Sequence, residues 1–164
     1  MSPAPGMFHQ SISGNLYGII WNELKNHKCK AFSAPFDVRL PLPENKRKNN
    51  KVDTVVQPDI CVVCDPDKLD QRGCNGAPDW IIEILSKGTS KRDLTEKYQL
   101  YQNAGVKEYW VVHPTDGTII PYILDEKGEY QLTRKTHYSV GEKINVHVFN
   151  NFEIDLEQVF DHEF

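Results

Sequence analysis

The sequence predicts an α/β fold in which two main helices pack against a central mixed β-sheet. Helical and strand patterns follow one another in the order helix, strands, helix, strands, which is typical of helices layered on a sheet. Residues 80–85 (WIIEIL) are apolar on both sides of the strand alternation, as in a central strand that is covered on both faces. A chain of 164 residues suits a single domain, 1–164, and residues 1–8 are expected to be loose.

Composition narrows the class of protein. With 39% hydrophobic and 26% charged residues the chain is not disordered, and a net charge of −4 argues against general coating of nucleic acid but permits a local basic patch. No apolar run approaches the roughly 20 residues of a membrane span, and MSPAPGM lacks the pattern of a signal peptide. We therefore expect a cytoplasmic protein whose four cysteines are reduced: Cys29, Cys61, Cys64 and Cys74.

The spacing Cys61-x-x-Cys64 is that of half a zinc site. Residues three apart in a strand point to opposite faces, and the chain has no second pair, so we do not expect zinc.

The first helix is predicted over residues 11–27, where apolar residues recur at helical spacing. Glu23 falls within this apolar stripe. Its carboxylate either reaches water at the helix edge, as long charged side chains do, or serves as an accessory acid near the site. His9, just before this helix, is expected to pack beside it rather than act.

Two strands and a polar loop are predicted next. Residues 36–40 alternate as a half-buried strand does, and residues 55–64 form a strand with Pro58 near its beginning and Asp59 directly before a buried run. The loop between them, residues 41–53, is basic. In a nuclease its cations would be candidate phosphate contacts, although a solvated loop is the commoner explanation: Lys46, Arg47, Lys48 and Lys51.

The strand at residues 80–85 and the helix after it carry the strongest functional clue. Glu83 lies within the apolar strand, where a carboxylate is costly without a partner. Ser90, with Asp93 three residues later, opens a helix that ends at Gly105, and Lys97 falls inside the inward-facing stripe of this helix. Two charges facing one interior indicate either a functional site or a buried ion pair that holds the helix to the sheet.

The remaining segments complete the sheet. The sequence predicts strands at residues 108–113, 118–124, 129–136 and 143–149, with hairpin signals at Asp116-Gly117 and at residues 125–128, and a short helix in FEIDLEQVF. Asp79 is expected to be a turn residue at the start of its strand.

The strands that carry Asp59 and Glu83 are consecutive, and the loop between them is long enough to let them pair. If they pair, two carboxylates and Lys97 converge around one cleft. Carboxylates are hard ligands that suit Mg²⁺, and a bound Mg²⁺ can polarise a phosphodiester and activate water. A lysine beside it would stabilise the charge that develops on phosphorus.

Three segments carry a family resemblance: PDICVVC, GAPDWIIEILSKGTS and KYQLYQNAGVKEYWVV. They resemble the Uma-two family of endonuclease-like proteins, in the PD-(D/E)XK restriction-endonuclease-like superfamily, and the likeness runs from about His9 to the C-terminal FEIDLEQVF. By this resemblance Asp59 matches the first acid and Glu83 the second. The superfamily lysine ordinarily stands two residues past the second acid, where this chain has Leu85, and Lys97 fills its place from the helix. His113 departs from the family's usual Asp.

The resemblance implies a restriction-endonuclease-like fold and a Mg²⁺-dependent endonuclease that hydrolyses DNA, with Mn²⁺ as a substitute ion. Asp59 and Glu83 would bind the metal and Lys97 would assist catalysis. Glu23, from its place in the stripe of the first helix rather than from the resemblance, is a second-tier accessory candidate. Cutting two strands would suit a homodimer. The alternative is a catalytically idle relative that serves as a nucleic-acid-binding or dimeric interaction module.

Overall fold

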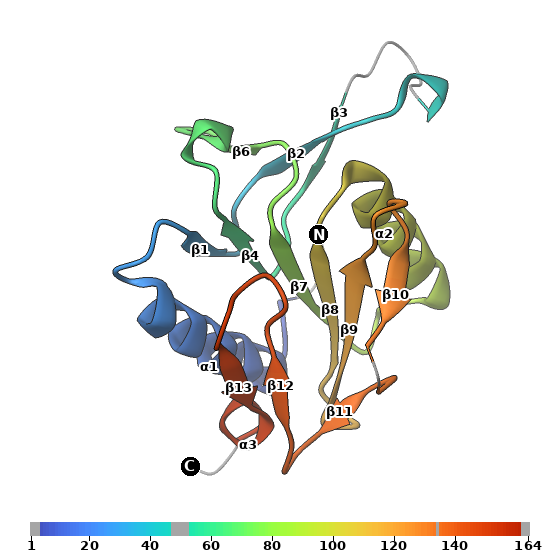
Figure 1. Ribbon diagram of the computed structural model, residues 1–164. Coiled ribbons are helices and arrows are strands. Elements are labelled where there is room, and N and C mark those ends of the chain that lie inside the picture. Colours follow the sequence, from blue (N-terminus) through green and yellow to red (C-terminus); the bar gives the residue numbers. More distant parts are fainter. Residues whose placement is uncertain (1–3, 47–52, 134, 162–164) are drawn as a thin grey trace.

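A computed structural model describes residues 4–46, 53–133 and 135–161 (Figure 1). Among these residues the central sheet has seven strands in the order β1-β4-β7-β8-β9-β10, with β11 also paired to β9. β7 and β8 are parallel and the other neighbours are antiparallel, so the sheet is mixed, as predicted. The strands are β1 (Lys30–Ser33), β4 (Ile60–Val63), β7 (Trp80–Ile84), β8 (Glu108–His113), β9 (Thr118–Leu124), β10 (Tyr130–Leu132) and β11 (Tyr138–Ser139).

Two helices cover opposite faces of this sheet: α1 (Met7–Leu24) and α2 (Lys91–Ala104) (Figure 1). Because side chains alternate along a strand, β7 contributes Ile82 to the core beneath α1 and Ile81 to the core beneath α2. Every residue of β7 is buried, which confirms the prediction of a central strand covered on both faces.

The predicted boundaries of α2 are confirmed. Ser90 Oγ accepts a hydrogen bond from Asp93 N at 3.1 Å, and Asp93 Oδ2 accepts one from Ser90 N at 3.1 Å, which is a complete capping box. Gly105 ends the helix with φ 86°, a left-handed conformation that favours glycine. The other helix, α1, begins at Met7 rather than at residue 11, and therefore includes His9.

The prediction of one strand over residues 55–64 is wrong. The segment divides into β3 (Asp53–Val56) and β4, which belong to different sheets. Pro58 lies at the division, where a residue without an N–H cannot continue a ladder. The second sheet has the order β3-β2-β6-β5, built from β2 (Val38–Pro41), β5 (Leu69–Asp70) and β6 (Gly73–Asn75), and short 3₁₀ turns lie at Glu44–Lys46 and Pro66–Lys68.

The C-terminal part packs against α1. It forms β12 (Lys143–Asn145), β13 (Glu153–Asp155) and the short helix α3 (Leu156–Val159), beside α1 in Figure 1. Buried Glu108 of β8 also holds this part, since its Oε1 accepts from Val148 N at 2.9 Å, while its Oε2 accepts from Trp110 Nε1 of the same strand at 2.6 Å. No helix among the described residues is long and apolar enough to cross a membrane.

The expectation that all four cysteines are reduced is wrong for two of them. Cys29 and Cys64 form a disulfide, whereas Cys61 and Cys74 are free and buried. β1 pairs with β4 in the register Lys30↔Val63, and one further step along this antiparallel ladder places Cys29 opposite Cys64. Cys61 packs in the core beneath α2 and Cys64 against the core beneath α1, so they do face opposite sides of the strand, as predicted.

Removing this disulfide should lower stability measurably. A closed loop with 35 residues of sequence separation is expected to contribute about 3–4 kcal/mol through the unfolded chain. The double variant Cys29→Ser, Cys64→Ser should lose about that free energy of unfolding in urea titrations. Reductant should destabilise the parent protein and leave the double variant unchanged. Equal stability of the oxidised parent and the double variant would contradict this account.

Glu108 should make stability depend on pH. Burial raises the pKa of its carboxyl from 4.5 to about 7, against the opposing hydrogen bonds. Because the folded pKa exceeds the unfolded value, its contribution to stability is full below pH 4.5 and is lost as pH rises towards about 7. The unfolding free energy of the parent, relative to Glu108→Gln, should fall by about 3 kcal/mol over that range. Parallel pH profiles for the two proteins would show that Glu108 does not titrate there.

Candidate active site

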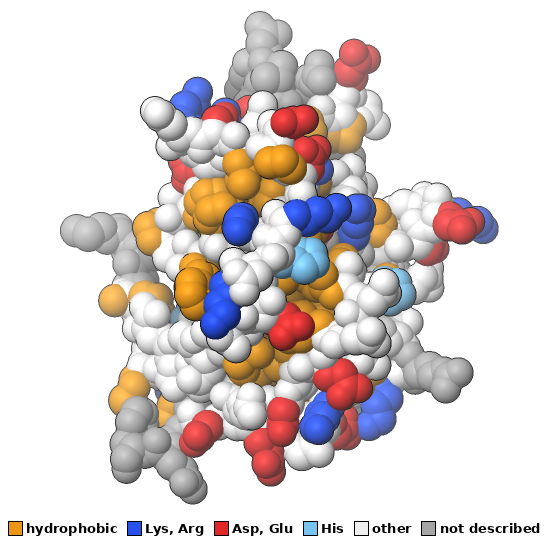
Figure 2. Space-filling model, turned by 60° about the vertical axis from the view of Figure 1, so that its left-hand side comes forward, with side chains coloured by type: hydrophobic (Ala, Val, Ile, Leu, Met, Phe, Trp, Pro, Cys, Tyr) orange, Lys and Arg blue, Asp and Glu red, His pale blue; other side chains and the backbone are white. Residues whose placement is uncertain are grey.

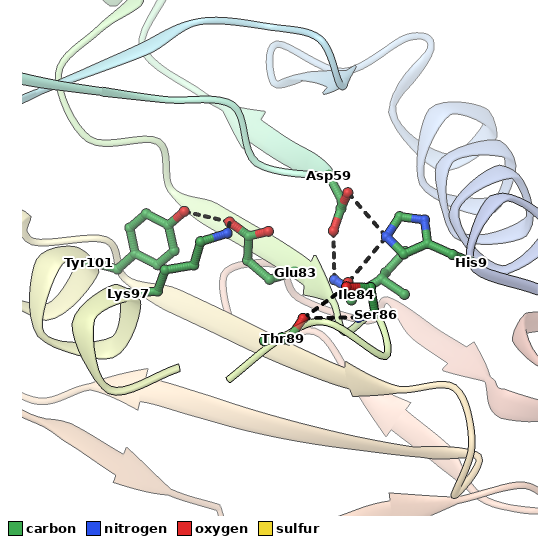
Figure 3. Close-up of polar contacts among 8 residues, drawn as sticks. All are labelled: His9, Asp59, Glu83, Ile84, Ser86, Thr89, Lys97 and Tyr101. Atoms are coloured by element: carbon green, nitrogen blue, oxygen red, sulfur yellow. Dashed lines mark hydrogen bonds and ion pairs between the residues drawn. The ribbon is translucent and has the colours of Figure 1, made fainter. Parts of the chain in front are cut away.

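Glu83 is the centre of the site. It is 6% exposed on β7, and its Oε1 accepts a hydrogen bond from Tyr101 Oη at 2.5 Å and pairs with Lys97 Nζ at 3.1 Å. Lys97 and Tyr101 lie one turn apart on α2 and point to Glu83 together (Figure 3). The helix lysine therefore faces the sheet, as its spacing predicts.

Burial has the largest effect on the ionisation of Glu83, and it raises the pKa of this carboxyl. Lys97 opposes that shift, and the negative charge of Asp59 adds to it. Burial also raises the pKa of Tyr101 well above its ordinary value, so the Tyr101 hydroxyl keeps its proton and donates a hydrogen bond to Glu83 Oε1. The carboxylate of Glu83 is thus oriented by two donors and remains electrostatically costly.

Asp59 lies beside Glu83 because β4 and β7 pair. The register Ile60↔Ile82, extended by one residue, places Asp59 opposite Glu83. β4 begins at Ile60, so it offers no strand carbonyl to the amide of Ile84 further along β7. Asp59 Oδ2 accepts the hydrogen bond of that amide instead, at 2.7 Å. A side chain completes the ladder here, which fixes the Asp59 carboxylate at the sheet edge.

His9 of α1 contacts both Asp59 and the end of β7. Its Nε2 lies 3.1 Å from the carbonyl oxygen of Ile84 and 3.5 Å from Asp59 Oδ1 (Figure 3). Sequence reasoning gave this contact no weight, because the helix was predicted to begin after His9. Tyr101 was assigned to the core stripe, and its place four residues after Lys97 was the signal that could have identified it.

A cavity of about 490 Å³ opens beside Glu83 and Lys97, between the end of β7 and the first turns of α2. The turn between these elements is ordered, since Ser86 N donates to Thr89 Oγ1 at 3.0 Å. Tyr109 also lines the cavity, and its buried hydroxyl has no partner among the described residues. Glu83 and Lys97 line this cavity, whereas Asp59 does not.

The other candidates lie apart from this site or outside the described residues. Glu23 is exposed on α1, fourteen residues and therefore about 21 Å along the helix from His9. Arg47, Lys48 and Lys51 lie outside the described residues, and only the backbone of Lys46 is described.

Asp79 and His113 lie at strand ends and make none of the contacts described for Glu83. Asp79 accepts from Cys64 N at 2.7 Å and pairs with Lys107 Nζ at 3.0 Å, so it does hold the start of β7. His113 follows Val112, the partner of Ile84, and therefore ends β8 beside Leu85.

Among the described residues, no three His, Cys, Asp or Glu side chains gather closely enough to hold a metal by themselves. Asp59 and Glu83 nevertheless supply hard oxygen donors from neighbouring positions on the paired strands, and the carbonyl oxygen of Ile84, the residue after Glu83, lies 3.1 Å from His9 Nε2 (Figure 3). The chemistry of the edge is that of an anionic oxygen site beside one ammonium group.

The model of the Uma2 family, described as "putative restriction endonuclease", matches residues 1–157. The chain belongs to the Uma2 family. The resemblance noted from the sequence is confirmed, and the family is one of nuclease-type hydrolases. No curated protein matches the chain.

One solved structure supports the same fold. It is described as a putative nuclease belonging to DUF820 from Anabaena variabilis, and it is 20% identical to this Uma2-family chain. The two superpose with a TM-score of 0.72 over 98% of this chain and 84% of that chain. The fold is therefore restriction-endonuclease-like.

Neutralising Glu83 tests whether this Uma2-family protein keeps the acid for stability. In Glu83→Gln the amide oxygen can still accept from Tyr101, the cost of burying charge disappears, and Lys97, 43% exposed, keeps its water. We expect the free energy of unfolding at neutral pH to change by less than about 1 kcal/mol, measured by chemical denaturation. A loss of about 3–5 kcal/mol would instead indicate a structural ion pair.

Proposed function

We propose that this protein is a divalent-metal-dependent nuclease that hydrolyses phosphodiester bonds in DNA. The observation that carries the proposal is the pairing of β4 with β7, which sets Asp59 opposite Glu83 while Lys97 Nζ lies 3.1 Å from Glu83. Two acids on paired strands, with one of them and the lysine lining a cavity, form a set that suits phosphoryl chemistry better than it suits packing.

The acids fit a hard divalent cation. Mg²⁺ prefers one or two carboxylates together with water and substrate phosphate, and Mn²⁺ accepts the same ligands. Both contacts that orient Glu83 end on Oε1, so Lys97 and Tyr101 hold the carboxylate by one oxygen. Nearby Asp59 raises the pKa of Glu83, and a cation between the two acids would offset that repulsion. When bound, the metal would polarise the phosphoryl group of the substrate and activate a water molecule.

Lys97 has the position of an electrostatic donor. Its side chain is 43% exposed, so the ammonium group can meet substrate from the cavity while it stays paired with Glu83. Charge that develops on phosphorus would be stabilised by this fixed cation. Tyr101 acts on Glu83 alone, since its hydroxyl is buried and directed at Oε1.

DNA is the substrate that we assign to the site. On the face in Figure 2, Lys and Arg side chains are interspersed with acidic and hydrophobic ones among the described residues, so no broad basic surface covers it. Contacts to the DNA backbone on this face would come from few cations, and the segment with Lys46, Arg47, Lys48 and Lys51 remains the proposed source of others. Cleavage of both strands would suit a homodimer.

A non-catalytic interaction module is the second candidate. The bonds from Lys97 and Tyr101 to Glu83 would, by themselves, tie α2 to the sheet. Titration calorimetry with Mg²⁺ and Mn²⁺ separates the two candidates. The nuclease requires divalent-ion binding that disappears in Asp59→Ala, whereas the module does not.

Lys97→Ala should separate catalysis from metal binding. We expect single-turnover cleavage of DNA with saturating Mn²⁺ to fall about 10²–10³-fold, because one fixed donor to the developing charge is lost. Metal affinity should stay nearly unchanged, whereas Asp59→Ala should abolish both. Lys107→Ala is the matched control, since Lys107 makes an ion pair of similar length, 3.0 Å, with Asp79 outside the site. Cleavage by Lys97→Ala at the parental rate would contradict this role.

A relocated lysine tests whether its position in space is what matters. Leu85 packs on the same side of β7 as Glu83 and lines the cavity with Lys97. The double variant Leu85→Lys, Lys97→Ala should therefore recover part of the activity that Lys97→Ala loses, in the same single-turnover assay. Leu85→Met with Lys97→Ala is the control that alters Leu85 without adding a cation.

A further inference from the structure

We propose that His9 is a further ligand of the divalent cation, through Nε2, next to Asp59 and the carbonyl oxygen of Ile84. This inference rests on the proposed function, in which Asp59 binds that cation. It adds α1 to a site otherwise built from β4, β7 and α2.

The geometry of three atoms carries the inference. His9 Nε2 lies 3.1 Å from Ile84 O and 3.5 Å from Asp59 Oδ1, and Asp59 is itself fixed by its 2.7 Å hydrogen bond from Ile84 N. In an octahedral site with metal–ligand bonds of about 2.1 Å, neighbouring ligand atoms are separated by about 3.0 Å. The atoms around His9 Nε2 are thus already spaced almost as neighbouring ligands are. Two side chains and one backbone carbonyl meet here.

The hydrogen bonding of the ring allows the exchange of a proton for a metal. A carbonyl and a carboxylate only accept hydrogen bonds, so Nε2 must carry the proton when it contacts both. The other nitrogen, Nδ1, is buried and has no partner among the described residues. With a cation held at the Nε2 lone pair, the neutral ring would carry its single N–H proton on Nδ1 instead of on Nε2. This change of tautomer breaks no hydrogen bond at Nδ1.

The position of His9 is set by the packing of α1. Its side chain is 13% exposed, and Ile12, one turn further along the helix, is fully buried in the core beneath α1. The ring is therefore held at the end of β7 and is not a free surface imidazole. A nitrogen ligand favours Mn²⁺ and Co²⁺ over Mg²⁺ and Ca²⁺, which prefer oxygen. We expect the site to bind Mn²⁺ more tightly than Mg²⁺, and His9 to be the reason.

Pulsed electron paramagnetic resonance of the full-length protein loaded with Mn²⁺ tests this directly. Echo modulation from a coordinated ¹⁴N should be present in the parent protein and should change to the ¹⁵N pattern when histidine is ¹⁵N-labelled. His9→Ala should remove the modulation and lower Mn²⁺ affinity in calorimetry about 10–100-fold, with a smaller loss for Mg²⁺. His9→Asn, whose amide can still contact Ile84 O, should retain the fold but not the modulation. His137→Ala, at an exposed histidine, is the control and should change neither.

The outcomes separate this inference from the proposed function. Mn²⁺ bound in an Asp59-dependent manner without nitrogen modulation would overturn the His9 ligand and leave the nuclease proposal standing. Nitrogen modulation that depends on His9, in a protein that cleaves no DNA, would support the ligand and overturn the nuclease. A parent protein that binds no Mn²⁺ would overturn both. The labelled parent protein decides the question even if His9→Ala fails to fold.

Discussion

The site depends on one hydrogen bond, from the amide of Ile84 to Asp59 Oδ2. β4 begins at Ile60, so the edge of β7 beyond it exposes a backbone donor that the sheet does not satisfy. An unpaired buried amide is costly, and a carboxylate that meets it is both stabilised and fixed in direction. The same atoms therefore complete the sheet and position the acid, which links the fold to the chemistry at Asp59.

Glu83, unlike Asp59, is costly to the fold. Burial raises the pKa of its carboxyl, and an apolar side chain in that place in the core would avoid the cost of burying a charge. Lys97 and Tyr101 are one turn apart on α2, whose start is fixed by the capping box at Ser90 and Asp93. The helix thus holds a partner for the acid in a defined position, an arrangement that a role in packing alone would not require.

The sequence predicted the parts of the site that depend on local patterns. The strand around Glu83, the start of α2 and the inward direction of Lys97 follow from alternation, capping and helical spacing. His9 could not be found this way, because Gly6 gives α1 no side-chain cap and Ile84 is 75 residues away. The disulfide was missed for a similar reason. Cys29 and Cys64 meet only through the register of β1 on β4, which composition and local sequence patterns do not reveal.

The site lies at the C-terminal end of β7 in the central sheet, where side chains from both helices reach the same strand. Asp59 contacts His9 from α1, whereas Glu83 contacts Lys97 and Tyr101 from α2, and these helices cover opposite faces (Figure 1). Leu85 stands where the superfamily lysine ordinarily does, on the α2 side, and Lys97 reaches the same cavity from the helix. In the function that we propose, a lysine on α2 makes catalysis depend on the docking of that helix, while the ligand that we infer at His9 makes metal binding depend on α1. Loss of packing on either face should then impair a different step, although Asp59 and Glu83 are neighbours on paired strands.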